Sequence, residues 1–158
     1  MRPKRRKSDS TVQRRIEETV RQSLAKKLGW AAAIEKRRFN CGESWVELDC
    51  YSEAGRAVLV GEINAHYGEL KAAQKNKVLR DILKMHLVHE ELRKKPDVTD
   101  VRLAIIFTNE AAARFLTAGR TWAAEAARSF GIECVVVPLT KREASLLQRA
   151  QRDQDLRS

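Results

Sequence analysis

The first recurring pattern in the chain is an apolar residue at every fourth position between residues 12 and 24. This spacing gathers the apolar side chains on one face of a helix and leaves the other face polar. We therefore predict an amphipathic helix over residues 10–27, which ends before Gly29. Its apolar positions are Val12, Ile16, Val20 and Leu24.

Residues 44–52 change to a period of two, which is typical of a strand. A turn containing Gly55 separates them from an apolar stretch that begins at residue 57 and is typical of a central strand. The pattern predicts a hairpin over residues 44–65. One face of its first strand would carry Val46, Leu48 and Cys50, and the other would carry Trp45, Glu47, Asp49 and Tyr51.

The rest of the chain alternates between helical and strand patterns. Strands are predicted at residues 98–109 and 132–139, helices at 69–94, 110–130 and 140–156, and a further strand fits near 34–41. This order predicts an α/β fold in which helices flank a mixed central sheet. We expect an αβββαβ-type core with an added α–β–α unit.

Length and composition indicate one domain. The chain has 158 residues, of which 43% are hydrophobic, and this suffices for a single core at residues 10–158. We expect residues 1–9 to form a disordered basic tail. No apolar run reaches the roughly 20 residues of a membrane span, and the N-terminus lacks the apolar part of a secretory signal. A cytoplasmic protein with no membrane partner is therefore expected.

Cysteines and charge narrow the possible partners. Three cysteines without paired spacing indicate reduced, packed thiols rather than a zinc site. The net charge of +10 favours an anionic partner, nucleic acid above all. An adaptor that docks an acidic protein is an alternative of another class. The basic tail and one predicted helix would contact phosphates, the helix through Lys71, Lys75, Lys77 and Arg80.

Candidate chemistry lies at the end of the second hairpin strand. Glu62 and Asn64 are two residues apart and share a face, and Asp49 lies on the neighbouring strand. Cross-strand neighbours on one face have Cβ atoms about 4.5–5.5 Å apart. Asp49 and Glu62 can therefore hold one cation if the register brings them together. These carboxylates, with the carbonyl oxygen of Ile63, suit Mg²⁺.

The helix that follows carries groups useful for phosphodiester hydrolysis. Lys71, Gln74 and Lys77 recur every three residues and lie on adjoining parts of one face. A bound metal ion lowers the pKa of its water and neutralises charge on the phosphate, and a lysine can assist either task. In the simpler alternative, Lys71 or Lys77 only forms a salt bridge with Glu62.

Asp49, the turn after it and the strand VLVGEIN resemble the core motif of the PD-(D/E)XK nuclease superfamily. That motif consists of an Asp, a spacer and a Glu-x-Lys that closes a strand. The resemblance covers roughly residues 10–108 and includes the predicted order of elements. It implies that Asp49 and Glu62 bind Mg²⁺ or Mn²⁺ and that the substrate is DNA. Asn64 stands where the family usually has its lysine.

Some relatives carry the working lysine on the following helix, a role that would fall here to Lys71, Lys75 or Lys77. Gln74 resembles a helix glutamine of several branches and would orient the water. Of these lysines, Lys71 and Lys77 are the leading candidates for the one that assists the water. Because Asn64 departs from the motif, the alternative is an inactive member that binds nucleic acid or a protein.

Two further expectations follow from the resemblance. Some branches place a glutamate in the first helix, where Glu17 or Glu18 would correspond, although Glu17 also has the spacing of an ordinary helix ion pair with Arg21. A homodimer is plausible, because cutting both strands of a duplex often uses two sites.

Overall fold

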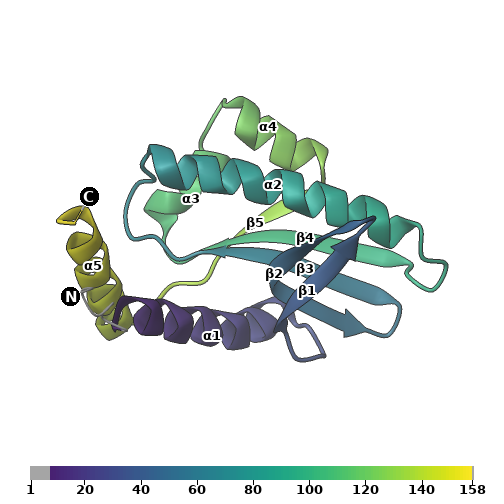
Figure 1. The fold of residues 1–158 in the computed structure, drawn as a ribbon, viewed down its shortest axis with the longest axis horizontal. Coiled ribbons are helices and arrows are strands. Elements are labelled where there is room, and N and C mark those ends of the chain that lie inside the picture. The colour runs from purple at the N-terminus through teal and green to yellow at the C-terminus, as the bar shows by residue number, and fades with distance from the viewer. Residues whose placement is uncertain (1–7, 158) are drawn as a thin grey trace.

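The computed structural model describes residues 8–157, and within them five strands form one mixed sheet in the order β1-β2-β3-β4-β5 (Figure 1). β1, β2 and β3 are antiparallel neighbours, whereas β4 and β5 run parallel to β3. The mixed α/β class predicted from the sequence is confirmed. The strands are β1 (Glu35–Cys41), β2 (Ser44–Ala54), β3 (Ala57–Asn64), β4 (Asp100–Phe107) and β5 (Ile132–Val136).

Helices cover both faces of this sheet and create two cores. The helices are α1 (Ser8–Leu28), α2 (Ala72–Arg93), α3 (Glu110–Thr117), α4 (Trp122–Ser129) and α5 (Lys141–Asp155). On one face, α2, α3 and α4 bury their apolar sides against the sheet. α1 and α5 lie on the other side (Figure 1). There α1 packs through Ile16, Val20 and Leu24, and α5 adds Leu147. The predicted i, i+4 stripe of the first helix therefore faces the sheet.

The predicted bounds of the N-terminal tail and of the long helix differ slightly from those in the structure. The predicted basic tail lies outside the described residues, except that Ser8 and Asp9 already belong to α1. The long helix begins at Ala72 rather than at residue 69, with Lys71 in an extended conformation at its N-cap. Within residues 8–157, no helix combines the length and apolar character needed to span a membrane.

The single helix predicted over residues 110–130 is wrong, because the segment forms α3 and α4 with a break at residues 118–121. Gly119 lies in this break, and glycine is costly inside a helix. The side chain of Thr121 then accepts a hydrogen bond from the backbone N–H of Ala124 and starts α4. A helix stop and a helix start therefore lie side by side in the sequence AGRT.

The alternation predicted for β2 also fails, at Asp49. Leu48 packs on the α2 side of the sheet, whereas Cys50 packs on the α1 side. The register between β1 and β2 shifts between Glu35 and Arg37, so that β2 contains an extra residue relative to β1. Such a bulge reverses the faces beyond it and commonly re-aims a side chain. The prediction that Leu48 and Cys50 share a face is therefore wrong.

Candidate metal and nucleic-acid site

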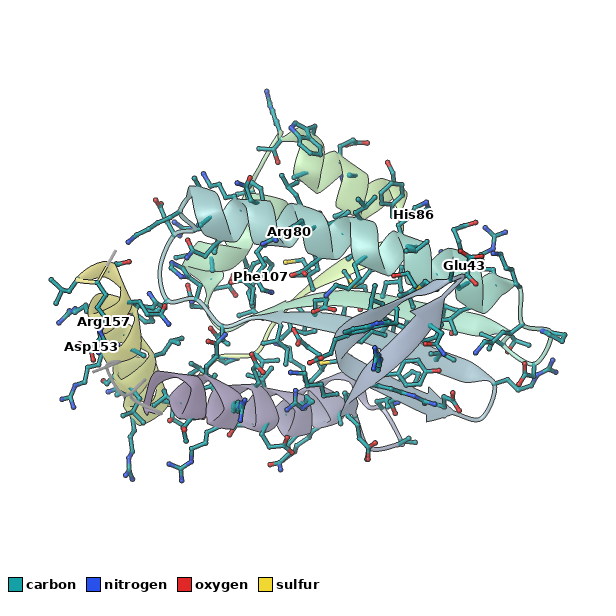
Figure 2. The ribbon with its side chains drawn as sticks, viewed as in Figure 1. Glu43, Arg80, His86, Phe107, Asp153 and Arg157 are labelled. Carbon is teal, nitrogen blue, oxygen red and sulfur yellow. The ribbon has the colours of Figure 1, made fainter. Side chains whose placement is uncertain are left out.

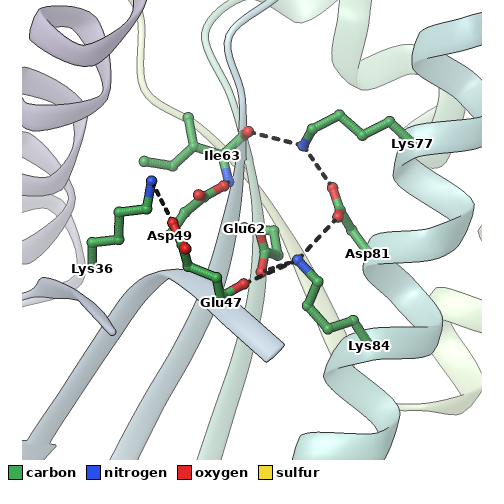
Figure 3. Close-up of polar contacts among 8 residues, drawn as sticks. All are labelled: Lys36, Glu47, Asp49, Glu62, Ile63, Lys77, Asp81 and Lys84. Atoms are coloured by element: carbon green, nitrogen blue, oxygen red, sulfur yellow. Dashed lines mark hydrogen bonds and ion pairs between the residues drawn. The ribbon is translucent and has the colours of Figure 1, made fainter. Parts of the chain in front are cut away.

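The side chain of Asp49 reaches across to β3 at the point where β2 and β3 stop pairing. Cys50 and Gly61 are the last residues paired between these strands, and Asp49 and Glu62 follow them. The Oδ2 atom of Asp49 accepts a hydrogen bond from the backbone N–H of Ile63 at 3.0 Å (Figure 3). The carboxylate thus replaces a main-chain partner that β2 no longer offers. Register and bulge together bring Asp49 beside Glu62.

Gly61 allows the strands to approach closely just before Glu62. A Cβ atom at this position would lie 2.9 Å from Cδ1 of Ile106 and 3.2 Å from both the carbonyl oxygen of Ala104 and Cβ of Cys50. Contacts this short require the surroundings to move. Glycine therefore lets β3 fit closely between its neighbours at the residue before Glu62.

Glu62 is a buried acid on the α2 side of the sheet, with 2% of its surface exposed. Lys84 of α2 donates a hydrogen bond to its Oε1 atom at 2.9 Å and another to the carbonyl oxygen of Glu47 at 3.1 Å. Burial, followed by the hydrogen bond and the negative charge of Asp49, raises the pKa of Glu62 to about 9, although Lys84 opposes this. At neutral pH Glu62 therefore keeps a proton, which a bound cation would displace.

Asp81 connects two lysines of α2 and is itself buried (Figure 3). Lys77 donates to Oδ2 of Asp81 at 2.9 Å and to the carbonyl oxygen of Ile63 at 3.4 Å. Lys84 lies 3.8 Å from the other carboxylate oxygen of Asp81. Burial lowers the pKa of Lys77, but Asp81 outweighs it and leaves that pKa above its usual value. Lys77 is therefore a fixed positive charge at the end of β3.

The opposite helix layer brings a third acid close to this point. Burial and the charge of Asp49 raise the pKa of Glu17 in α1, while Lys36 and Arg21 partly oppose the shift. The expected Glu17–Arg21 ion pair is not the one formed, because Arg21 pairs with Glu18 at 3.0 Å. Arg21 also donates to the backbone carbonyl of Asp49 at 3.1 Å. Of the two glutamates suggested by the family resemblance, Glu17 is the one whose charge interacts with Asp49.

A small cavity of about 160 Å³ lies next to these groups and contains Asn64, Gln74 and Lys77 in its wall. The Nδ2 atom of Asn64 and the Oε1 atom of Gln74 are buried and have no hydrogen-bond partner among the described residues. Buried amide groups normally have partners, often an ordered water. The cavity is therefore suited to a water molecule or a polar ligand group, which these two amides would hold.

Other candidate lysines lie away from the carboxylates. Lys71 forms a 2.8 Å ion pair with Asp155 of α5 on the molecular surface. The ammonium of Lys75 lies 5.7 Å from the centre of the Phe115 ring. Arg80, which is labelled in Figure 2, is exposed and lines a groove with Leu83. Of the predicted site residues on α2, the structure thus brings Gln74 and Lys77 to the end of β3, and leaves Lys71, Lys75 and Arg80 outside it.

Sequence reasoning did not single out Asp81 or Lys84 as a site residue. The salt bridge to Glu62, expected from Lys71 or Lys77, comes instead from Lys84. A signal was present, because Lys77, Asp81 and Lys84 follow one another at i, i+4 and i+7 on one helical face. An acid between two lysines on the face that docks on the sheet indicates a buried charge network.

The oxygen atoms at the end of β3 fit a magnesium or manganese ion chemically. They comprise the carboxyl groups of Asp49 and Glu62 and the carbonyl of Ile63, and Mg²⁺ prefers such oxygen ligands and keeps several waters. Among residues 8–157, no three His, Cys, Asp or Glu side chains converge enough to hold an ion by themselves. The carbonyl and bound water would therefore have to complete the ligand set.

The site combines two carboxyl groups, a strand-end carbonyl and two ammonium groups, with two amides in the adjoining cavity. This geometry is the basis for a functional assignment, because comparison with family models, with curated proteins and with solved structures found no match for the chain.

Proposed function

We propose that the protein is a metal-dependent nuclease that hydrolyses DNA phosphodiester bonds with Mg²⁺ or Mn²⁺. The observation that carries the proposal is the meeting of Asp49 and Glu62 at the end of β3, opposite the ammonium group of Lys77. Paired carboxyl groups beside a fixed cation are the arrangement that phosphate chemistry requires. The order of elements and the motif around Asp49 and Glu62 resemble those of the PD-(D/E)XK nuclease superfamily, and this resemblance supports the same proposal.

Asp49, Glu62 and the carbonyl of Ile63 would hold the ion. When bound, a divalent ion lowers the pKa of a water ligand and neutralises charge on the phosphate. Lys77 keeps its proton at neutral pH, since Asp81 raises its pKa. Its role is therefore to stabilise negative charge on the phosphate rather than to accept a proton. Asp81 is a positioning residue that holds Lys77 toward the end of β3.

Asn64 and Gln74 would orient the attacking water. Each has a buried amide atom without a partner among the described residues, and both line the cavity that adjoins Lys77. Asn64 thus takes the place of the usual motif lysine as a hydrogen-bonding group, while Lys77 supplies the charge from the helix. Exposed basic side chains near the start of α2, such as Lys75, would contact DNA phosphates without reading sequence.

A second function is favoured by one specific observation. Lys84 already donates a 2.9 Å hydrogen bond to Glu62, so the buried acid has a hydrogen-bond partner without any metal ion. A protein with this arrangement can retain the nuclease fold as an inactive module that binds nucleic acid or a protein. The two possibilities differ in whether Asp49 is needed for DNA cleavage or only for strand geometry.

A cleavage assay separates them. Purified protein is incubated with supercoiled plasmid, linear duplex, single-stranded DNA or RNA, in Mg²⁺, Mn²⁺ or EDTA. The nuclease proposal predicts metal-dependent cutting of DNA that falls at least about 100-fold in Asp49→Asn and Glu62→Gln. Glu133→Gln, which changes an exposed acid on β5, is the matched control and should cut normally. Retention of DNA by wild type and Asp49→Asn alike, without cutting, would instead support the inactive module.

A further inference from the structure

The outer face of α2 carries two exposed leucines where a surface helix normally carries polar residues. Leu83 is 67% exposed and Leu87 is 45% exposed. They border a groove of about 540 Å³ that β2 closes with Val46. The opposite face of the helix is buried, because Ile82, Met85 and other apolar residues there pack against the sheet. The two leucines therefore form an apolar strip that is separate from the core.

The charges that flank this strip are arranged symmetrically. Arg80 precedes Leu83 by three residues, and Glu90 follows Leu87 by three residues. Arg80, Leu83, Leu87 and Glu90 are spaced by three, four and three residues, so they lie along one side of the helix. The strip is thus positive at one end, apolar in the middle and negative at the other end.

A strip of this kind complements itself when two copies are placed antiparallel. With a two-fold axis that crosses the outer face of α2 at the level of residue 85, Leu83 of one helix would lie against Leu87 of the other. Arg80 would then face Glu90 at both ends. This is the geometry of an isologous interface, in which one patch meets its own copy. Because each chain carries a net charge of +10, self-association requires a surface whose local charges attract.

The two charged residues are available for such pairing. Among residues 8–157, the guanidinium of Arg80 makes no hydrogen bond or ion pair, although the residue is exposed and borders the groove. Glu90 forms a 3.6 Å ion pair with Arg93, and both side chains are largely exposed. Exposed pairs of this type contribute little and exchange partners readily.

We propose that the α2 face formed by Arg80, Leu83, Leu87 and Glu90 is the interface of a two-fold symmetric homodimer. This assigns Arg80 to association between copies rather than to DNA. Lys84, which holds Glu62, also borders the groove, so each candidate site lies beside the interface. Lys77 lies eight residues from Met85, which separates the two Lys77 residues by about 24 Å along the helix direction at 1.5 Å per residue. The dimer does not depend on the nuclease proposal.

Charge reversal tests both the surface and its antiparallel pairing. Sedimentation of the wild-type chain should give twice the monomer mass of 18.0 kDa at micromolar concentration. Arg80→Glu alone places two acids together at each end, and Glu90→Arg alone places two bases together, so each should weaken dimerisation by tenfold or more. Arg149→Glu, on the exposed side of α5, is the matched control and should leave the dimer unchanged.

Mixing the two single variants gives the decisive result. In a mixed dimer every reversed charge meets its opposite, so equimolar Arg80→Glu and Glu90→Arg should form a heterodimer, and the double variant should form a homodimer. A wild-type chain that stays monomeric at 100 µM overturns the proposal, because the strip would then serve some other partner. Single variants that dimerise as wild type, or a mixture that does not associate, overturn this interface. Circular dichroism confirms that each variant is folded.

Discussion

Glu62 shows how one buried acid can link stability to function. Its carboxyl group is almost fully enclosed, and the neighbouring Asp49 opposes its ionisation while Lys84 favours it. Burial of a charge is costly unless its partners compensate fully. In the proposed site, a divalent cation would displace the proton of Glu62 and pair with both carboxylates. Without a bound cation, ionisation of Glu62 lowers the stability of the folded protein.

Glu62→Gln should therefore change how stability depends on pH. Between the ordinary pKa near 4.5 and the folded value of about 9, the folded state holds a proton that the unfolded state has lost. Wild-type stability then falls as pH rises, by at most about 1.4 kcal/mol per pH unit from this group. Glutamine does not titrate, so the free energy of unfolding of the variant should rise steadily relative to that of wild type from pH 5 to pH 9.

Urea unfolding in EDTA at several pH values measures this difference. Glu133→Gln controls for the loss of one surface carboxylate, and its difference from wild type should change little over the same range. A constant difference between Glu62→Gln and wild type from pH 5 to pH 9 would show that Glu62 titrates normally.

Lys84 should matter more for stability than Lys71, because only Lys84 pairs with a buried acid. Lys84→Met leaves Glu62 and the carbonyl of Glu47 without their donor, and should lower the free energy of unfolding by about 1–3 kcal/mol. Lys71→Met breaks only an exposed pair with Asp155 and should cost less than about 1 kcal/mol. Equal effects in urea unfolding would contradict the buried network.

At the scale of elements, the candidate site near the end of β3 involves a bulge in β2 and a glycine in β3. The bulge in β2 turns Asp49 toward Ile63, and Gly61 allows β3 to fit closely between its neighbours. Strands that separate at this point expose a carbonyl and an N–H to side chains. The two deviations from regular sheet geometry are therefore what creates the site.

Gly61→Ala tests this close fit. The new methyl group would lie 2.9 Å from Cδ1 of Ile106, and we expect a loss of about 1–3 kcal/mol in the free energy of unfolding. Ile106→Val removes that Cδ1 atom, so the double variant should be more stable than the sum of the two single effects predicts. Strict additivity in thermal or urea unfolding would indicate that the contact does not limit the fit.

The elements were predictable from the sequence where a local pattern determines them. The i, i+4 stripe of α1 and the apolar stretch of β3 identified both correctly, because burial on one face or on two faces is visible in the pattern. The bulge at Asp49 was not predictable, since it depends on pairing with β1. The choice of Lys84 over Lys71 as the partner of Glu62 depends on how α2 is rotated on the sheet, which propensity does not determine.

At the scale of the whole molecule, helices on both faces of the sheet place charged side chains near the end of β3. α1 brings Glu17 toward Asp49 from one face, and α2 brings Lys77 and Lys84 from the other. The carboxyl end of a strand in an α/β sheet is a common place for a ligand site. The outer side of α2, with its apolar strip, would then place a second copy of the same site beside the first.

The most direct test of the account is the binding of Mn²⁺ to the protein without DNA, followed by the electron paramagnetic resonance signal of the free ion. Wild type should bind one ion per chain, more tightly as pH rises toward 9, because the ion displaces the proton held by Glu62. Asp49→Asn and Glu62→Gln should each weaken binding at least about tenfold, whereas Glu133→Gln should bind as wild type. If millimolar Mn²⁺ does not bind, or binds equally to all four proteins, the end of β3 is not a metal site.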